Sequence, residues 1–359
     1  MSKIQQAKEW YEERERHVST AFLVGGFIFD SITLKRIDSL IDNVWIATNL
    51  LLVCICIVLI NRGENAGENN GSWKNFWLFN VMQFSFGALL GASFIFYFRS
   101  ATLAISWPFL AILLAAILAN EYFQKRYARL TFQISFLYLS VFIFAIFLLP
   151  VVLHSIGPFI FILSGVVSLL FVWGFMNVLR MFAKEKFKQS LMPIWQSVTV
   201  IFLTLNILYF TNLIPPIPLS LKDAGIYHAI SRDAEGNYLV TEEKKGWGRF
   251  FTLGENIHWV PGTPLYAYTA VFSPGSLNTQ VVHEWQYKDE AGKWVTATRI
   301  PLYLSGGRSD GFRIFSVKYN LTPGEWRINV ATPRGQVLGR INFEIVSVTS
   351  TPALNTSVK

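Results

Sequence analysis

Residues 195–218, WQSVTVIFLTLNILYFTNLIPPIP, contain the point at which the chain changes character. Residues 195–213 are almost wholly apolar, and this length suits an α-helix that crosses the roughly 30 Å hydrocarbon core of a bilayer. Proline then recurs at positions 215, 216 and 218. Because proline cannot continue a helix, residues 214–223 are predicted to be a stiff, extended linker. We therefore expect a helical membrane part before the junction and a different kind of domain after it.

The chain before the junction repeats the same apolar pattern. Hydrophobic residues make up 52% of the 359 residues and charged residues only 15%, against roughly 25% charged residues in an ordinary soluble domain. These values exclude a disordered chain, a fibrous repeat and a single soluble domain. Besides 195–213, the runs long enough to span a membrane are 44–60, 76–98, 101–119, 134–153 and 158–179. A weaker run, 18–34, is interrupted by Asp30.

The distribution of Lys and Arg predicts how these helices cross the membrane. With seven crossings and a charged N-terminal tail (residues 1–17) in the cytoplasm, the inner segments carry 13 Lys and Arg and the outer loops carry three. If 18–34 does not cross, the ratio becomes nine to seven, which the positive-inside rule disfavours. We therefore predict a seven-helix membrane domain over residues 18–213. Its last helix places the C-terminal domain in the periplasm of a bacterium, with the membrane part in the inner membrane.

After the linker the hydrophobic period becomes that of strands. In residues 325–330, EWRINV, polar and apolar residues alternate, which is typical of a strand with one buried face. Short segments of this kind, separated by Gly, Pro, Asn and Asp, indicate an all-β sandwich of the immunoglobulin type over residues 224–346. The expected strands are 225–230, 238–241, 265–272, 281–287, 294–300, 312–319, 326–331 and 337–346. Residues 347–359 are expected to be a flexible tail.

Particular residues of this second part carry a resemblance to a known family. They are His283-Glu284-Trp285-Gln286-Tyr287, Gly306-Gly307, Arg313, Ser316, Lys318, Pro323-Gly324-Glu325-Trp326-Arg327, Gly335 and Val337-Leu338. Residues 260–346 thereby resemble the bacterial domain-of-unknown-function family 2914, which occurs at the C-terminus of envelope proteins, often behind a multi-helix membrane part. The resemblance implies an envelope context and no particular activity.

The residue patterns offer candidate binding positions but no catalytic centre. His228, His258 and His283 lack metal-ligand spacing, and the Gly-rich run 306–311 lacks the Gly-Lys-Ser/Thr ending of a phosphate-binding loop, so we expect no metal and no cofactor. The net charge of +8 is spread over both halves of the chain, which disfavours nucleic acid as a partner. The candidate binding residues of the β domain are His283, Trp285, Arg308, Arg313, Lys318 and Trp326; the candidate intramembrane polar residues are Asp30 and Gln83.

Two hypotheses on function follow. In the first, the helices anchor a non-enzymatic binding module that contacts an envelope protein, peptidoglycan or lipid headgroups; Arg308, Arg313, Lys318 and Arg327 could form a basic patch for anionic glycans or lipids. In the second, the chain is a transporter or membrane enzyme whose polar site lies among the helices, and the β domain is an extracytoplasmic cap.

Overall fold

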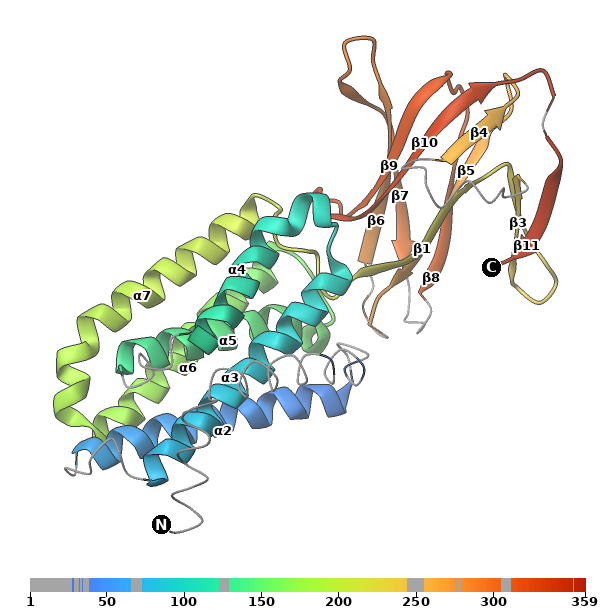
Figure 1. Cartoon of the computed structure of the whole chain (residues 1–359). Helices are drawn as coiled ribbons and strands as arrows, with labels where there is room; N and C mark the ends of the chain where they lie inside the picture. Colours follow the sequence, from blue (N-terminus) through green and yellow to red (C-terminus); the bar gives the residue numbers. More distant parts are fainter. Residues whose placement is uncertain are drawn as a thin grey trace, which may run out of the picture. The chain divides into compact units, whose positions relative to one another are not determined.

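The computed structural model describes residues 39–65, 73–122, 129–243, 255–274, 277, 279–304, 311–350 and 352–359, together with the single positions 28, 32 and 34. The described residues fall into two compact units (Figure 1). The helical unit lies within residues 1–99 and 107–211, and the β unit lies within 100–106 and 212–359. Along the chain the second boundary between the units lies between residues 211 and 212.

Six helices of the described chain are long and apolar enough to cross a membrane. They are α2 (Leu40–Asn65), α3 (Trp73–Ser100), α4 (Leu103–Tyr122), α5 (Leu130–Leu153), α6 (Pro158–Phe182) and α7 (Lys184–Phe210). Each overlaps one of the six strong apolar runs of the sequence. The weaker run 18–34, predicted as a seventh crossing, lies outside the described residues apart from three single positions.

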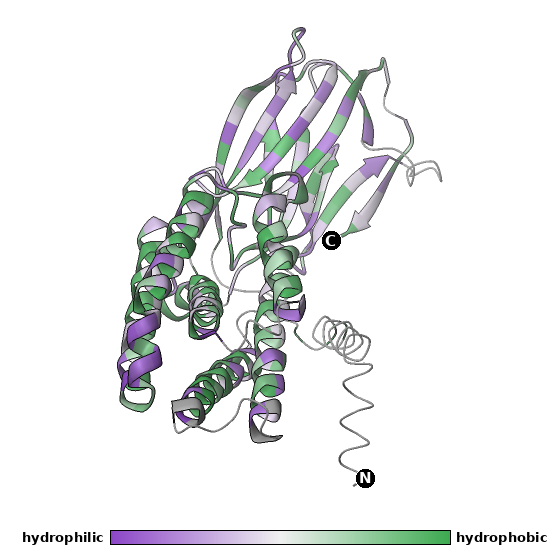
Figure 2. Ribbon diagram, turned by 60° about the vertical axis from the view of Figure 1, so that its left-hand side comes forward, coloured by the Kyte–Doolittle hydropathy of each residue, from purple (hydrophilic) through white to green (hydrophobic). Residues whose placement is uncertain are grey.

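Helix α5 forms the centre of the helical unit. It packs against α2, α6 and α7, and 67% of its span is buried, compared with 22% for α7. The outer surface of the unit is apolar as well: Leu51, Leu170 and Val200 are 60 to 63% exposed. Helices that are hydrophobic on all sides need a solvent that is itself apolar, and a bilayer supplies one. In Figure 2 these helices are hydrophobic over most of their length, whereas hydrophobic and hydrophilic residues alternate along the strands.

The β unit contains eleven strands among the residues that the structure describes. They are β1 (Ser220–Tyr227), β2 (Ala229–Arg232), β3 (Tyr238–Glu243), β4 (Glu255–Trp259), β5 (Leu265–Phe272), β6 (Thr279–Lys288), β7 (Trp294–Leu304), β8 (Phe312–Lys318), β9 (Gly324–Ala331), β10 (Val337–Ser347) and β11 (Leu354–Val358). They form a three-stranded sheet β1-β5-β8, a five-stranded sheet β4-β10-β9-β6-β7 and a three-stranded sheet β11-β3-β2.

The strands agree with the sequence-based prediction in most places and differ in three. Residues 225–230, predicted as one strand, belong to two, because β1 ends at Tyr227 and β2 starts at Ala229. Strand β4 was not predicted. The third difference is β11, which lies where a flexible tail was expected and pairs antiparallel with β3 over residues 354–358. The end of the chain is therefore part of a sheet.

The core of the β unit lies between the sheet β1-β5-β8 and the five-stranded sheet. From the five-stranded sheet come Trp285, Trp326 and Phe343, all 3% exposed or less; β5 contributes Leu265 and Ala267. These inward-facing residues alternate along each strand with residues that face the other way. That alternation gives the five-stranded sheet a second, outer face, and the polar side chains of the unit gather there.

Candidate functional site

The outer face of the five-stranded sheet carries rows of polar residues that lie directly opposite one another on neighbouring strands. One row runs Arg299–Glu284–Asn329–Arg340 across β7, β6, β9 and β10. The next row runs Thr296–Gln286–Arg327–Asn342 across the same strands. We call these eight residues the outer ladder. Side chains placed in this way are within reach of one another, since opposite residues have Cβ atoms roughly 4.5–5.5 Å apart.

Two amide side chains connect the rows of the outer ladder. Gln286 Oε1 accepts from Arg327 Nε at 2.6 Å and from Asn329 Nδ2 at 3.2 Å, while Gln286 Nε2 donates to Thr296 Oγ1 at 3.0 Å. Asn329 Oδ1 accepts from Arg340 Nε at 2.7 Å, and Asn329 Nδ2 also donates to Glu284 Oε2 at 3.1 Å. Gln286 and Asn329 are only 8% and 5% exposed. Their amide groups thus hold both arginines and the glutamate in place.

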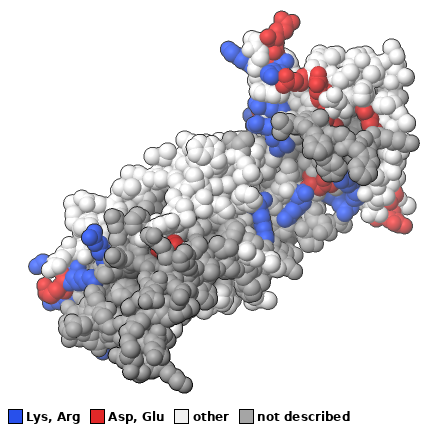
Figure 3. All heavy atoms as spheres, viewed as in Figure 1, with Lys and Arg blue, Asp and Glu red and all other residues white. Residues whose placement is uncertain are grey.

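Aromatic and ionic contacts border the outer ladder. The Arg327 guanidinium lies over the Trp294 ring, 4.2 Å from its centroid. Lys288 Nζ forms an ion pair with Glu325 at 2.9 Å, and Arg299 Nε lies 3.9 Å from Glu284 Oε1. Figure 3 shows Lys and Arg atoms gathered on the side of the unit that carries β6, β7 and β9, with Asp and Glu atoms close by. The face is therefore charged with both signs and well ordered by its own contacts.

The predicted residues His283 and Trp285 point into the core instead. Both are 0% exposed. His283 bonds through Nε2 to Thr269 Oγ1 and through Nδ1 to Ser316 Oγ, each at 2.9 Å, and Trp285 Nε1 donates to Ser316 Oγ at 3.0 Å. The four residues form a buried polar network that links β6 with β5 and β8. Because both ring nitrogens already have partners, the imidazole has no position left for a ligand.

Burial sets the protonation state of the histidine in this network. Removal from water disfavours the charged imidazolium and lowers the pKa of His283 to about 4. At neutral pH the ring is therefore uncharged, with one donor nitrogen and one acceptor nitrogen, which suits a ring held between two hydroxyl groups. The arrangement stabilises the fold, since the buried ring is bonded to the hydroxyl groups of Thr269 and Ser316.

The remaining predicted binding residues do not form one site. Arg313 is on β8, where its guanidinium donates to the Lys359 carbonyl at 2.8 Å, and Lys318 is at the end of the same strand. Trp326 is a core residue, 3% exposed, and Arg308 lies outside the described residues. Arg327, the remaining member of the suggested basic patch, is on the other sheet. Within the described residues the patch is not assembled.

The outer ladder was only partly foreseeable. The alternation in residues 325–330 places Arg327 and Asn329 on one exposed face, and this signal was visible in the sequence. The partners from β6, β7 and β10 depend on register, which the sequence alone does not supply. Arg340 and Gln286 were missed for this reason.

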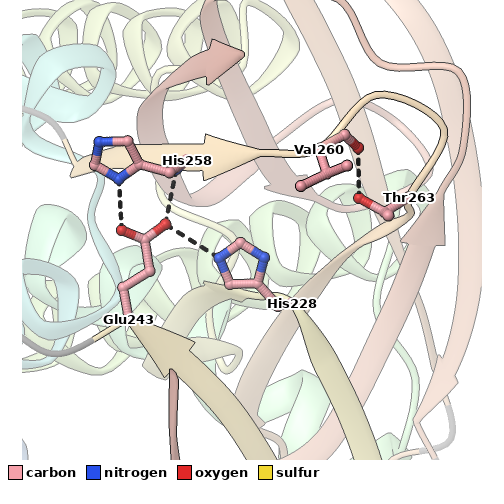
Figure 4. Close-up of polar contacts among 5 residues, drawn as sticks. All are labelled: His228, Glu243, His258, Val260 and Thr263. Carbon is pink, nitrogen blue, oxygen red and sulfur yellow. Dashed lines mark hydrogen bonds and ion pairs between the residues drawn. The ribbon is translucent and has the colours of Figure 1, made fainter. Parts of the chain in front are cut away.

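A second polar cluster joins the ends of three strands (Figure 4). Glu243, the last residue of β3, accepts at Oε2 from His258 Nδ1 and at Oε1 from the His258 backbone N–H, each at 2.7 Å. Its Oε1 also lies 3.1 Å from His228 Nε2, between β1 and β2. Burial raises the pKa of Glu243, but these hydrogen bonds outweigh it, so the pKa lies below its ordinary value. Among the described residues no group of three His, Cys, Asp or Glu could hold a metal ion, so we interpret the cluster as a clamp between strands.

In the helical unit, Gln83 connects two neighbouring helices. Its Nε2 lies 3.4 Å from the Asn120 carbonyl, and Asn120 Nδ2 donates to the Gln83 carbonyl at 3.2 Å, so α3 and α4 are bonded reciprocally. A Cβ at Gly87, one turn further along α3, would also meet Asn120. Asp30, the other predicted intramembrane residue, lies outside the described residues.

Comparison with solved structures gives matches of low similarity. They include a β-glucosidase from Listeria innocua in complex with isofagomine, at 11% identity over 31% of this chain and 16% of that chain, with a TM-score of 0.21. An immunoglobulin-like protein from Pseudomonas aeruginosa matches at 11% identity over 36% of this chain and 98% of that chain, with a TM-score of 0.21. An alkylpurine DNA glycosylase from Pseudomonas fluorescens matches at 9% identity over 85% of this chain and 98% of that chain, with a TM-score of 0.23. The chain thus spans about a sixth of the length of the β-glucosidase.

Comparison with protein families gives one match. No curated protein matches the chain. The family model described as a protein of unknown function, DUF2914, matches residues 278–345, which cover β6 to β9 and nearly all of β10. Four of the five strands of the outer face, and with them all eight residues of the outer ladder, lie in the matched segment. The resemblance predicted from the residue motifs is therefore confirmed for this part of the chain: residues 278–345 match the DUF2914 family model.

Proposed function

We propose that this chain is an integral protein of a bacterial inner membrane that presents its β unit in the periplasm as a non-enzymatic binding module. Six helices long and apolar enough to span a bilayer support the membrane part. The excess of Lys and Arg on one side of the apolar runs supports an N-terminus in the cytoplasm and seven crossings, with 18–34 as the first. The partner is an envelope component: a protein, peptidoglycan or lipid headgroups.

The fold of the β unit supports the role of a scaffold. Two sheets share one core, and the residues of β6 and β9 alternate between that core and the outer face. We infer that the unit is a sandwich of the immunoglobulin type, an architecture that commonly displays binding surfaces. In such a sandwich the side chains of the displayed surface supply the specificity.

The observation that carries the proposal is the outer ladder. A sheet face needed only for solubility does not require its side chains to be fixed by one another. Here two nearly buried amides hold two arginines and a glutamate in place through hydrogen bonds of 2.6 to 3.2 Å. Preorganised polar groups of this kind lower the entropy that is lost when a ligand binds.

The alternative, a transporter or membrane enzyme, has less support. It needs polar groups among the helices that are available to a substrate. Gln83 and Asn120 are engaged with each other, and a reciprocal bond of this kind holds helices together. Asp30→Asn and Gln83→Leu test the alternative: we expect both variants to keep the function of the protein in cells.

Two experiments test the proposal itself. A reporter enzyme that is active only outside the cytoplasm, fused after Lys359, is expected to be active; activity of a cytosolic reporter instead would refute the topology.

A photo-crosslinking amino acid at Tyr303, which is 75% exposed on the outer face, is expected to capture an envelope component in intact cells. The matched control is Tyr319, which is 59% exposed and follows β8 of the other sheet. Equal capture at both positions, or none at Tyr303, would contradict the proposal.

A further inference from the structure

We propose that Arg327 and Arg340 form a recognition site for the carboxylate groups of an acidic polysaccharide. This inference rests on the proposed function and names the ligand class of the outer ladder. Arg327 lies opposite Asn342, and Arg340 lies opposite Asn329, so the two arginines are diagonal neighbours on β9 and β10. Diagonal neighbours on one face are separated by roughly 7–8 Å, a span that two long side chains close easily.

The hydrogen bonds of the outer ladder leave the terminal guanidinium nitrogens of both arginines available to a ligand. Each guanidinium is anchored through Nε, that of Arg327 to Gln286 and that of Arg340 to Asn329. The terminal nitrogens of both residues make no hydrogen bond within the described part of the chain. The Gln286 Oε1 and Asn329 Nδ2 atoms, in contrast, each already make two hydrogen bonds. Recognition therefore depends on terminal guanidinium N–H groups, and their forked geometry matches an oxyanion.

Electrostatics favours an anion between the two side chains. Partial burial and the charge of Arg340 lower the pKa of Arg327, which reports that the positive charges repel one another. Glu284 compensates in part, and its carboxylate is already occupied by Asn329 and Thr296. A bound carboxylate would accept from both guanidinium groups and relieve the remaining repulsion. The Trp294 ring stacks on the Arg327 guanidinium and limits its motion, so the guanidinium is preorganised for binding.

The other charges of the face argue against a membrane surface as the ligand. On the same face of the sheet, the four cations Lys288, Arg299, Arg327 and Arg340 are accompanied by three carboxylates, those of Glu284, Glu325 and Glu344. A plane of anionic headgroups would meet these three carboxylates as well as the arginines. A polymer with carboxylates spaced along an otherwise neutral, hydroxyl-rich chain can place single charges at the arginines. The exposed Tyr303 ring offers an apolar face with a polar edge to such a chain.

The test uses the full-length protein purified in detergent and a fluorescein-labelled oligogalacturonate as the probe. We expect saturable binding to the wild-type protein and at least a tenfold loss of affinity in R327K/R340K. This double variant keeps the net charge but removes both forks. K293Q, which removes a charge from the exposed β6–β7 turn, is the matched control and is expected to bind as the wild type does. Protection of β9 and β10 from hydrogen exchange checks that the double variant is folded.

Each other outcome overturns the inference. No binding to the wild-type protein, equal binding by R327K/R340K, or an equal loss in K293Q would show that the arginines are not a carboxylate site. Binding of phosphatidylglycerol vesicles, or of inorganic phosphate, in preference to the oligogalacturonate would assign the arginines to a different ligand class. If Tyr303 still captures an envelope component in cells while the arginine variant binds normally, the ligand class is wrong and the proposed function stands. Capture at neither tyrosine means that the proposed function fails as well.

Discussion

The helical unit and the β unit handle polar groups in opposite ways. The helical unit leaves large apolar side chains exposed, such as Leu170 at 60% and Val200 at 63%, and joins its helices through single polar pairs such as Asn61 with Gln133. The β unit encloses a polar network around His283 within its apolar core and keeps a second, hydrogen-bonded set on its outer face. The same principle governs both, because an unpaired polar group away from water is costly in either setting.

The two units obtain their stability from different sources. In the β unit, burial of apolar surface from water is the main driving force. Between helices in a bilayer that force is absent, since lipid tails are as apolar as leucine, and close packing with modest hydrogen bonds replaces it. Substitutions of buried residues should therefore have large effects in the β unit and small effects in the helical unit. The following predictions test this difference.

The largest effect is expected for Trp285→Ala. Trp285 is 0% exposed, lies edge-on to Phe343 and donates to Ser316, so its loss leaves a cavity and removes one hydrogen bond of the buried network. We expect a loss of about 3–5 kcal/mol in the free energy of unfolding of the β unit, measured by hydrogen exchange of β6 and β9 in the full-length protein. Trp294→Ala on the outer face is the control and should lose about 1 kcal/mol or less. Similar losses in both variants would contradict the assignment of inner and outer faces.

The next effect concerns the pH dependence of the β unit. The pKa of His283 is about 4 in the folded protein, against an ordinary value of 6.5. The unfolded chain therefore binds a proton before the folded chain does, and stability is lost as the pH falls from about 6.5 to about 4. The loss amounts to about 3 kcal/mol, with a maximum slope of about 1.4 kcal/mol per pH unit.

His283→Gln removes this titration and supplies the control for it. Gln keeps a donor and an acceptor but does not ionise in this range. The variant starts from a lower stability at pH 7, and its stability should change less between pH 6.5 and pH 4 than that of the wild type. The measurement is hydrogen exchange of β5, β6 and β8 at several pH values. Parallel pH profiles for the two proteins would show that His283 is not buried in its neutral form.

The sequence predicted the parts of the fold that depend on local pattern. Apolar runs of membrane length mark each of the six helices, and β-branched and aromatic residues bounded by turn residues predicted β5 with its correct ends. Strand β11 was missed because Leu354–Val358 is polar and mostly exposed, and only its pairing with β3 makes it a strand. His283 and Trp285 were singled out correctly as a pair on one side of a strand, but which side faces the core depends on the partner sheet. The outer ladder depends on register across four strands, and no local pattern contains that.

A smaller effect is expected at the clamp that joins β3 to β4. Glu243→Gln removes the negative charge that accepts from His258 and His228. We expect a loss of about 1–2 kcal/mol at pH 7, seen as faster hydrogen exchange in β3 and β4. The pKa of Glu243 is lowered in the folded protein, so its contribution is present above pH 4.5 and is lost as the pH falls through the folded value. The wild type and the variant should therefore converge in acid, and a constant difference down to pH 3 would contradict the prediction.

The smallest effect is expected in the helical unit, for a buried pair of amide side chains. Asn61 Nδ2 donates to Gln133 Oε1 at 2.8 Å between α2 and α5, and both residues are 0% exposed. In water-soluble proteins the loss of a buried partner is costly, but in a bilayer the unfolded helices find other partners for the same groups. A double-mutant cycle with Asn61→Leu and Gln133→Leu should therefore give a coupling energy of about 0.6 kcal/mol, measured by unfolding in mixed micelles. A coupling well above 2 kcal/mol would mean that this pair behaves like the buried network of the β unit. The two units would then share one mode of stabilisation rather than two.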